Sequence, residues 1–187
     1  MKNATKKLVC SALFAALSVV FARLLAIAPE PSVRFSFETI PLFLGGLCFG
    51  PFYGAMIGFV SDFAGSLLFS EFGYNPLLSI SPILFGLISG LLRLWLKREI
   101  RLWKIIVAVI PPIVIASILW QSFALAYLNS NGEALWVVYT GFLTARSIQF
   151  AIIYVIDVTL ISILCRTNVF NRLGCLPKWR TKHVKNS

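Results

Sequence analysis

The sequence predicts an all-α integral membrane protein with six transmembrane helices and both termini in the cytoplasm. Of the 187 residues, 58% are hydrophobic and only 13% are charged, and the mean hydropathy is +0.85. A soluble domain carries roughly 25% charged residues, so this composition excludes an ordinary soluble fold. One span needs about 20 apolar residues, which leaves room for five to seven spans in a single transmembrane domain, residues 1–187.

Apolar runs set the expected elements in chain order. They predict spans at about residues 8–28, 40–49, 52–69, 79–96, 105–128 and 143–164. The polar segment 28–39, the pair Gly50-Pro51, segment 70–78, a basic connection and segment 129–133 separate them. Stretch 135–141 is open to two interpretations: an interfacial segment divided from the sixth span by Gly141, or part of that span. We expect residues 165–187 to form a basic cytoplasmic tail.

The basic residues are clustered. Fourteen of the 17 Lys and Arg residues lie in stretches 2–7, 93–104 and 166–185. With six spans, all three stretches fall on one side of the bilayer, and the positive-inside rule makes that side the cytoplasm. No basic stripe with interleaved aromatic residues is present, so we expect lipid around this chain and no nucleic acid.

Ionisable residues inside predicted spans are candidates for function, because a membrane disfavours them. Asp62 lies in the third span, and Arg146 lies near the outer end of the sixth. Arg23 borders the first outer loop, where snorkelling to the headgroups is an equally good explanation. Asp157 lies deeper in the sixth span, where a hydrogen bond to a neighbouring helix would account for it.

Polar groups and aromatic rings on the outer side together predict a binding site for a flat ring, although an interfacial aromatic belt explains any single ring as well. The candidate ligand contacts are Arg23, Arg34, Phe35, Asp62, Tyr74, Asn75, Trp120, Gln121, Arg146 and Gln149.

Catalytic and metal-binding chemistry is not expected. The one histidine, His183, lies in the tail, which excludes a zincin motif and an intramembrane Ser-His-Asp triad. The four cysteines show no CxxC spacing, and no Gly-rich phosphate loop precedes a lysine. We therefore expect no catalytic residue, no metal and no cofactor in this chain. A paired-aspartate intramembrane protease remains an alternative.

Small residues in the first span suggest a close helix contact. Ala12 and Ala16 are one helical turn apart, and such pairs let helices approach closely in lipid. The contact is either internal packing or docking to another membrane protein.

These motifs resemble those of a known family. The alanine-rich stretch Ala12–Leu17 resembles an AxxxA docking face, and segment 34–68 begins RFSFETIP, continues through Gly50-Pro51 and contains G-x-x-S-D at 58–62. The chain is similar to the substrate-binding S component of energy-coupling-factor (ECF) vitamin transporters, folate branch.

The resemblance implies a division of labour. An S component of the bacterial plasma membrane binds its vitamin from outside, between spans four to six and under outer loops that include Asn75. Ala12 and Ala16 then dock on a separate transmembrane coupling subunit, and two cytoplasmic ATPases bind the ATP. Pantothenate, riboflavin and queuosine-precursor branches share the plan, and an intramembrane enzyme or an assembly factor is the alternative from another class.

Overall fold

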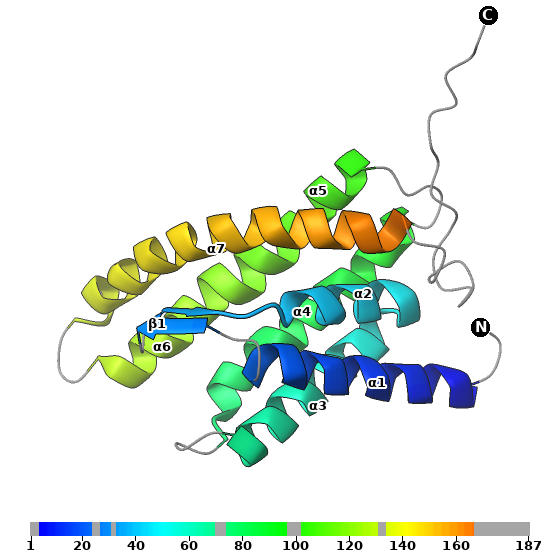
Figure 1. Ribbon diagram of the computed structural model, residues 1–187. Helices are drawn as coiled ribbons and strands as arrows, with labels where there is room; N and C mark the ends of the chain where they lie inside the picture. Colours follow the sequence, from blue (N-terminus) through cyan, green and yellow to red (C-terminus); the bar gives the residue numbers. More distant parts are fainter. Residues whose placement is uncertain are drawn as a thin grey trace, which may run out of the picture.

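The computed structural model describes residues 4–23, 27–30, 33–69, 74–96, 102–130 and 134–166. Its helices and strands are α1 (Ala4–Arg23), β1 (Ile27–Glu30), β2 (Val33–Phe35), α2 (Thr39–Phe49), α3 (Pro51–Phe69), α4 (Pro76–Leu96), α5 (Leu102–Pro112), η1 (Ile113–Trp120), α6 (Gln121–Asn129) and α7 (Leu135–Arg166). The long helices run alongside one another, and the first turn of α1 and the last turn of α7 lie at the same end of the bundle (Figure 1).

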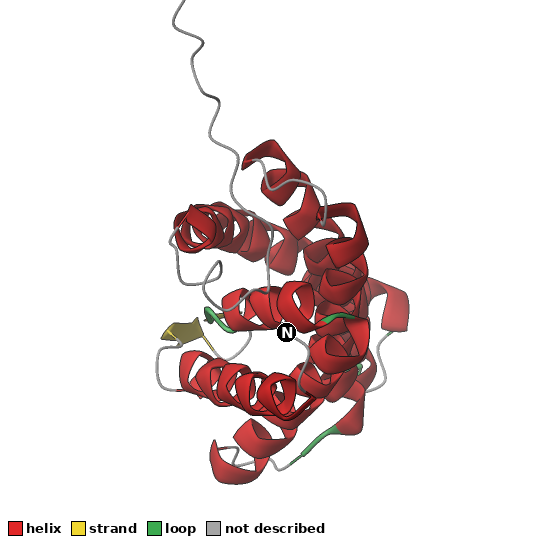
Figure 2. Cartoon of the chain, turned by 90° about the vertical axis from the view of Figure 1, so that its right-hand side faces the viewer, coloured by secondary structure: helices red, strands yellow, loops and turns green. Residues whose placement is uncertain are grey.

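A helical membrane core, as predicted, makes up most of the described chain. Five helical segments are long and apolar enough to cross a membrane: Ala4–Arg23, Pro51–Phe69, Pro76–Leu96, Leu102–Asn129 and Leu135–Cys165. The second predicted span corresponds to α2, a shorter apolar helix. Seen along the bundle, the helices pack together with the short strands at one edge (Figure 2).

The first predicted loop contains a β-hairpin that the sequence analysis did not expect. Strands β1 and β2 pair antiparallel, with Ile27 opposite Phe35 and Glu30 opposite Val33. Apolar and polar residues alternate from Val33 to Phe37, which is the period of a strand. The loop prediction followed the prolines and overlooked this alternation.

Helix α2, which the sequence analysis predicted as the second of six transmembrane helices, is too short to cross a bilayer by itself, so five described helical segments are long enough to cross and not six. Its 11 residues span about 16 Å, roughly half of the hydrocarbon thickness. It ends at Gly50, whose φ of 98° is in the left-handed region that favours glycine. Pro51 then begins α3, a position where its missing N–H costs no helical hydrogen bond. The N-terminus of α2 therefore lies within the length of the bundle, and the hairpin leads the chain to it (Figure 1).

Glycines bring α3 and α4 into backbone contact. A Cβ on Gly54 would collide with the carbonyl group of Gly86, and a Cβ on Gly86 would collide with that of Gly54. One turn further along α3, Gly58 faces the backbone of Pro82 in the same way. Helices in lipid approach this closely only through small residues, so these glycines fix how α3 crosses α4.

Helix α2 joins the same contact. A Cβ on Gly46 would come within 2.7 Å of the Gly86 carbonyl oxygen and 2.9 Å of the Gly90 amide nitrogen. The core cluster of buried apolar side chains includes most of α2, among them Phe43, which is fully buried.

The fifth predicted span consists of three consecutive helical segments, α5, η1 and α6. Pro111 and Pro112 end α5 and provide no backbone N–H, and a π-helix, η1, follows them directly. A proline inside a helix removes a hydrogen bond and crowds the preceding turn, and kinks and π-bulges are common responses. The prolines therefore account for the wider turns of η1.

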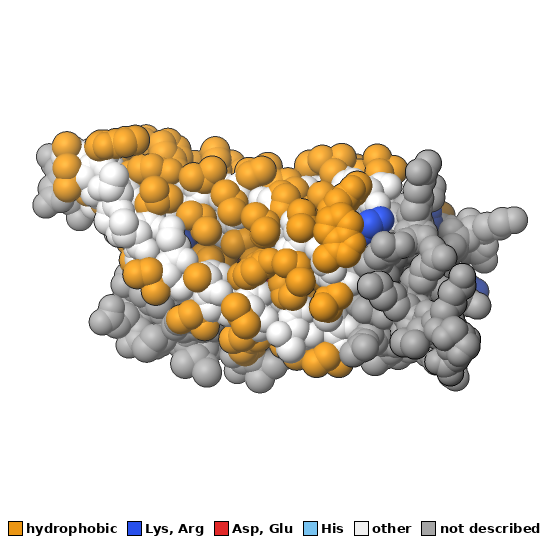
Figure 3. Space-filling model, turned by 90° about the horizontal axis from the view of Figure 1, so that it is seen from above, with side chains coloured by type: hydrophobic (Ala, Val, Ile, Leu, Met, Phe, Trp, Pro, Cys, Tyr) orange, Lys and Arg blue, Asp and Glu red, His pale blue; other side chains and the backbone are white. Residues whose placement is uncertain are grey.

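Helix α7 runs without interruption through Gly141. Stretch 135–141 is accordingly the first part of the last helix, and the division at Gly141 that one interpretation expected is not found. The face of the bundle that carries α5 and α7 is mostly hydrophobic, and basic side chains gather near one end (Figure 3). Such a surface suits a lipid environment.

Replacing Gly86 by Leu should destabilise the protein by at least about 1–3 kcal/mol, because the side chain would have to separate two backbones. Thermal unfolding of the purified chain in detergent measures this. Gly141→Leu is the matched control, because a Cβ at Gly141 meets nothing within 4 Å. Equal melting temperatures for the two variants would contradict the close contact.

Candidate ligand-binding site

The first turn of α4 positions the predicted acid. Asn75 precedes the helix and its Oδ1 accepts a hydrogen bond from the Leu77 amide at 3.1 Å, a typical N-cap, while Pro76 takes the first helical position. The Ser79 hydroxyl, buried on α4, donates to Oδ2 of Asp62 on α3. Asp62 is half-buried, so its carboxylate is anchored to α4 and not fully enclosed.

Arg23 lies against the same side of α3. Its Nη2 is 3.4 Å from the hydroxyl of Ser66, and a Cβ at Gly65 would come 3.1 Å from its Nε. Ser66 is one helical turn from Asp62. The C-terminal parts of α1 and α3 and the start of α4 thus carry one set of polar side chains, Arg23, Asp62, Ser66, Asn75 and Ser79, which we term the α3–α4 polar group. Tyr74 adjoins it through an edge contact with Phe63, at 5.2 Å between ring centroids.

Another side of α4 binds η1. The indole Nε1 of Trp120 donates to the carbonyl oxygen of Leu77 at 3.1 Å. The ring of Trp120 begins a row of aromatic side chains, with centroids 6.0 Å apart for Trp120 and Phe123 and 6.5 Å apart for Phe123 and Tyr127. Gln121 follows Trp120 and reaches Ser81 of α4, at 3.4 Å between side-chain oxygens.

Arg146 and Gln149 on α7, which we term the α7 polar group, are only 7% and 4% exposed. The Arg146 guanidinium lies 5.5 Å from the centroid of Phe150, a distance at which a cation and a ring attract. Its Nε has no hydrogen-bond partner among the described residues. Glu38, just before α2, acts on it electrostatically. A buried guanidinium with an unused donor is suited to an acidic ligand group.

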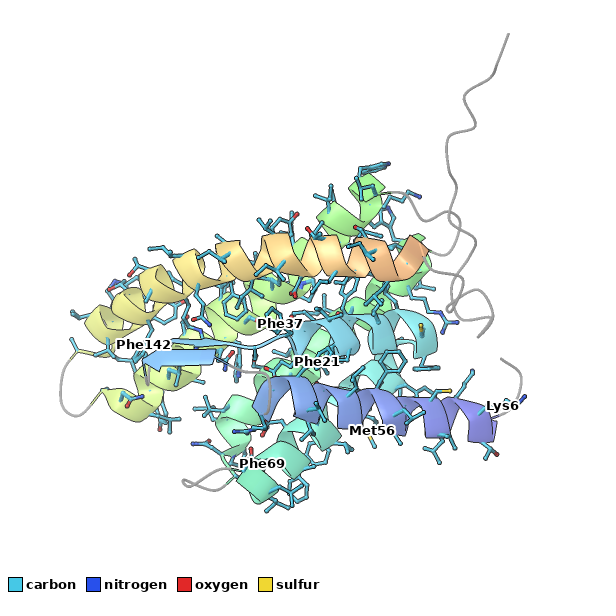
Figure 4. All side chains as sticks on the ribbon, in the orientation of Figure 1. Lys6, Phe21, Phe37, Met56, Phe69 and Phe142 are labelled. Carbon is cyan, nitrogen blue, oxygen red and sulfur yellow. The ribbon has the colours of Figure 1, made fainter. Side chains whose placement is uncertain are left out.

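Phe37 and Phe142 show how this region is enclosed. Phe37 lies between the hairpin and α2, beneath α7, and packs against the hydrophobic core (Figure 4). Phe142, on the N-terminal part of α7, lies near the hairpin (Figure 4). Strand β2, which contains Arg34 and Phe35, contacts α7, but the side chains of both residues lie outside the described part of the chain.

Asp157, three turns along α7 from Arg146, is fully buried beside Thr39 of α2. Neither its carboxylate oxygens nor the Thr39 hydroxyl form a hydrogen bond of standard geometry within the described residues. Thr39 belongs to a neighbouring helix and still interacts with the Asp157 carboxyl group through its side chain, although not in standard hydrogen-bond geometry, so the structural explanation that the sequence suggested for Asp157 is supported. The N-terminus of α2 provides a partial positive charge that favours a carboxyl group at this place.

The predicted site residues fall into separate groups. Helix α3 packs on α1, α2 and α4, whereas α7 packs on α2, α5, α6, η1 and β2. Asp62 and Gln149, which sequence reasoning combined, therefore belong to different helix pairs, and Gln149 lies one turn from Arg146. The early turns of α4 connect Asp62, through Ser79, with Trp120 and Gln121, through Leu77 and Ser81. The sequence analysis missed Ser81, although a serine between apolar residues of a span was a usable signal.

Helix α1 shows two faces. Ser11, Ala15 and Ser18, spaced four and three residues apart, are buried against the bundle. Ala12 and Ala16 are exposed and are flanked by the exposed side chains of Leu8, Leu13 and Leu17. Ala12 and Ala16 thus take no part in internal packing. Of the two interpretations of this pair, docking to another membrane protein is the one that is left.

Comparison with known proteins identifies the family. Residues 2–166 match the family described as "ECF-type riboflavin transporter, S component". This chain belongs to that S-component family. It is 25% identical over 158 residues to the folate transporter FolT of Clostridium novyi (strain NT), covering 84% of this chain and 89% of that protein. It also resembles the crystal structure of FolT bound with folic acid, with a TM-score of 0.71 and 28% identity over 86% of this chain and 93% of that one.

Family membership settles the general class. The S component is a multi-pass membrane protein and a transporter subunit, not an enzyme, and its family works with an ECF module and a vitamin. Asp62 and Asp157, which a paired-carboxylate protease would combine, lie on α3 and α7.

Proposed function

We propose that this S component binds folate from the outer side of a bacterial plasma membrane. The observation that carries the proposal is the likeness, over most of both chains, to a FolT structure that contains folic acid, with a TM-score of 0.71 and 28% identity. The relative from Clostridium novyi, a folate transporter, supports the same vitamin.

The two polar groups suit the two ends of folate. Its pterin ring offers adjoining N–H donors, and a carboxylate such as Asp62 accepts both in charge-assisted hydrogen bonds. Its glutamate tail is acidic, and the planar fork of Arg146 matches a carboxylate. In this arrangement Asn75, Tyr74 and Arg23 adjoin the ring, Gln149 supports Arg146, and Trp120 and Gln121 lie between the ends. Arg34 and Phe35 belong to strand β2 of the hairpin and remain proposed ligand contacts.

Riboflavin is the second candidate, because the matched family is named for it. Riboflavin carries no carboxylate, so the unused Nε donor of the buried Arg146 would find no carboxylate on that ligand. This chemistry favours folate.

The coupling arrangement follows the family. We propose that the exposed face of α1 around Ala12 and Ala16 docks on the transmembrane coupling subunit, and that two ATPases bind the ATP, so the chain itself needs no cofactor. The common end of α1 and α7 (Figure 1) suits the proposed cytoplasmic position of both termini.

Titration of the purified full chain in detergent with folic acid and with riboflavin, followed by calorimetry, tests the function. Saturable binding of folic acid alone supports it. Binding of riboflavin alone would replace folate with the second candidate, and binding of neither would contradict the proposal.

Asp62→Asn should weaken folic acid binding about 10–100-fold, the scale of one charge-assisted hydrogen bond. Asp157→Asn is the matched control, since it makes the same exchange at a buried acid outside the proposed site, and its affinity should stay within about twofold of the wild type. Equal affinities for both variants would show that Asp62 only links α3 to α4.

Arg146→Ala should weaken folic acid binding about 10–100-fold and leave binding of a pterin without the glutamate tail nearly unchanged. Arg146→Lys keeps the charge without the fork and should show an intermediate loss. Equal losses for the two ligands would make Arg146 a structural residue.

Ala12→Trp should abolish vitamin uptake and co-purification with the coupling subunits, because bulk at this face holds a partner helix away. Ligand affinity of the isolated chain should persist. Ala15→Trp, on the buried face of the same helix, should instead lower the melting temperature and the affinity together. Full uptake by Ala12→Trp would exclude the docking role.

A further inference from the structure

Ser81 ties α4 to the π-helix η1. Its side chain is 4% exposed, and its hydroxyl donates to the carbonyl oxygen of Ala116 at 2.9 Å. One turn earlier on α4, Leu77 accepts the indole hydrogen bond of Trp120. These two bonds connect the early turns of α4 to the middle of η1, at Ala116, and to its last residue, Trp120.

The hydroxyl also meets Gln121. Ser81 Oγ lies 3.4 Å from Gln121 Oε1, the longer of its two contacts. A serine hydroxyl has one proton but can also accept hydrogen bonds. That proton goes to the carbonyl oxygen of Ala116, so the Ser81 hydroxyl can only accept a hydrogen bond from Gln121. If the Gln121 amide turns its nitrogen toward Ser81, the amide donates to the Ser81 hydroxyl, and the hydroxyl donates to the Ala116 carbonyl. The two amide orientations differ only by a half-turn.

Gln121 stands where the helix type changes. It is the first residue of α6, and its backbone N–H donates to Ile118, three residues back, directly after the wider turns of η1. The direction of its side chain therefore depends on how η1 ends. π-Helical turns are rare and occur frequently at functional sites.

We propose that Ser81 is a positioning residue of the vitamin site. It holds the middle of η1 through Ala116 and orients the Gln121 amide, so that Gln121 presents its carbonyl oxygen to an N–H donor on the ligand ring. This inference rests on the proposed function, in which Gln121 contacts the vitamin. It adds a preference for ring N–H donors, which folic acid and riboflavin both carry.

A double-mutant cycle on the full chain tests the role. Affinity for folic acid and for riboflavin is measured for the wild type, Ser81→Ala, Gln121→Ala and the double variant, together with the melting temperature of each. Ser89→Ala is the matched control, because Ser89 is equally buried on α4 but donates within its own helix, to Phe85 at 2.7 Å. Ser81→Thr restores the hydroxyl.

Ser81→Ala should weaken binding about 3–10-fold, as expected for one hydrogen bond, while Ser81→Thr and Ser89→Ala stay close to the wild type. In the Gln121→Ala background, removal of the Ser81 hydroxyl should add no further loss. Equal effects of Ser81→Ala in both backgrounds, or equal affinities of Ser81→Ala and Ser89→Ala, would overturn the inference. If the wild type binds only riboflavin, folate is refuted as the substrate, and the role of Ser81 is tested by the riboflavin affinities of the same variants. If it binds neither vitamin, both proposals fall.

Discussion

Backbone contact between the glycines of α3 and α4 is the constraint on which the other features depend. Because Gly54 and Gly86 have no Cβ, each lies directly against the backbone of the other helix, and α2 fits into the same place through Gly46. The resulting position of α4 brings Ser79 to Asp62, and brings Leu77 and Ser81 to η1. Helix α4 carries few ligand candidates of its own, but it therefore sets the positions of the candidates on α3 and in the fifth span.

The polar side chains inside this apolar bundle differ in whether their hydrogen-bonding groups have partners. The Ser81, Ser89 and Tyr154 hydroxyls each donate to a backbone carbonyl, which removes most of the cost of burying them. Arg146 is different, because it lies near the Phe150 ring and under the electrostatic influence of Glu38 while its Nε keeps an unused donor. A strongly buried cation of this kind adds little to the stability of the fold by itself. The difference separates hydroxyls that hold helices together from a guanidinium that suits an acidic ligand.

Hydropathy and charge were sufficient to predict a helical membrane protein, because burial in lipid demands long apolar helices and little else. Local departures from regular α-helix were harder to predict from the sequence. The hairpin at 27–35 was hidden by its prolines, and the π-helix depends on how Pro111 and Pro112 are accommodated within a packed span. Among the candidate residues, sequence reasoning identified Asp62 and Arg146 as unusual from their polarity. The three-residue spacing of Arg146 and Gln149 in one predicted span already implied that they are neighbours, but the contact between Ser81 and Gln121 could not be predicted, since it depends on helix rotation and packing.

Identification of the vitamin that the native protein retains tests the central claim most directly. The full chain, purified in detergent from cells grown with a mixture of vitamins, is denatured, and the released small molecules are examined by mass spectrometry and by absorbance. The account predicts folate with its pterin absorbance, in proportion to the protein. A flavin in the same proportion, or protein that retains no vitamin and gains none when folic acid is supplied, would contradict it.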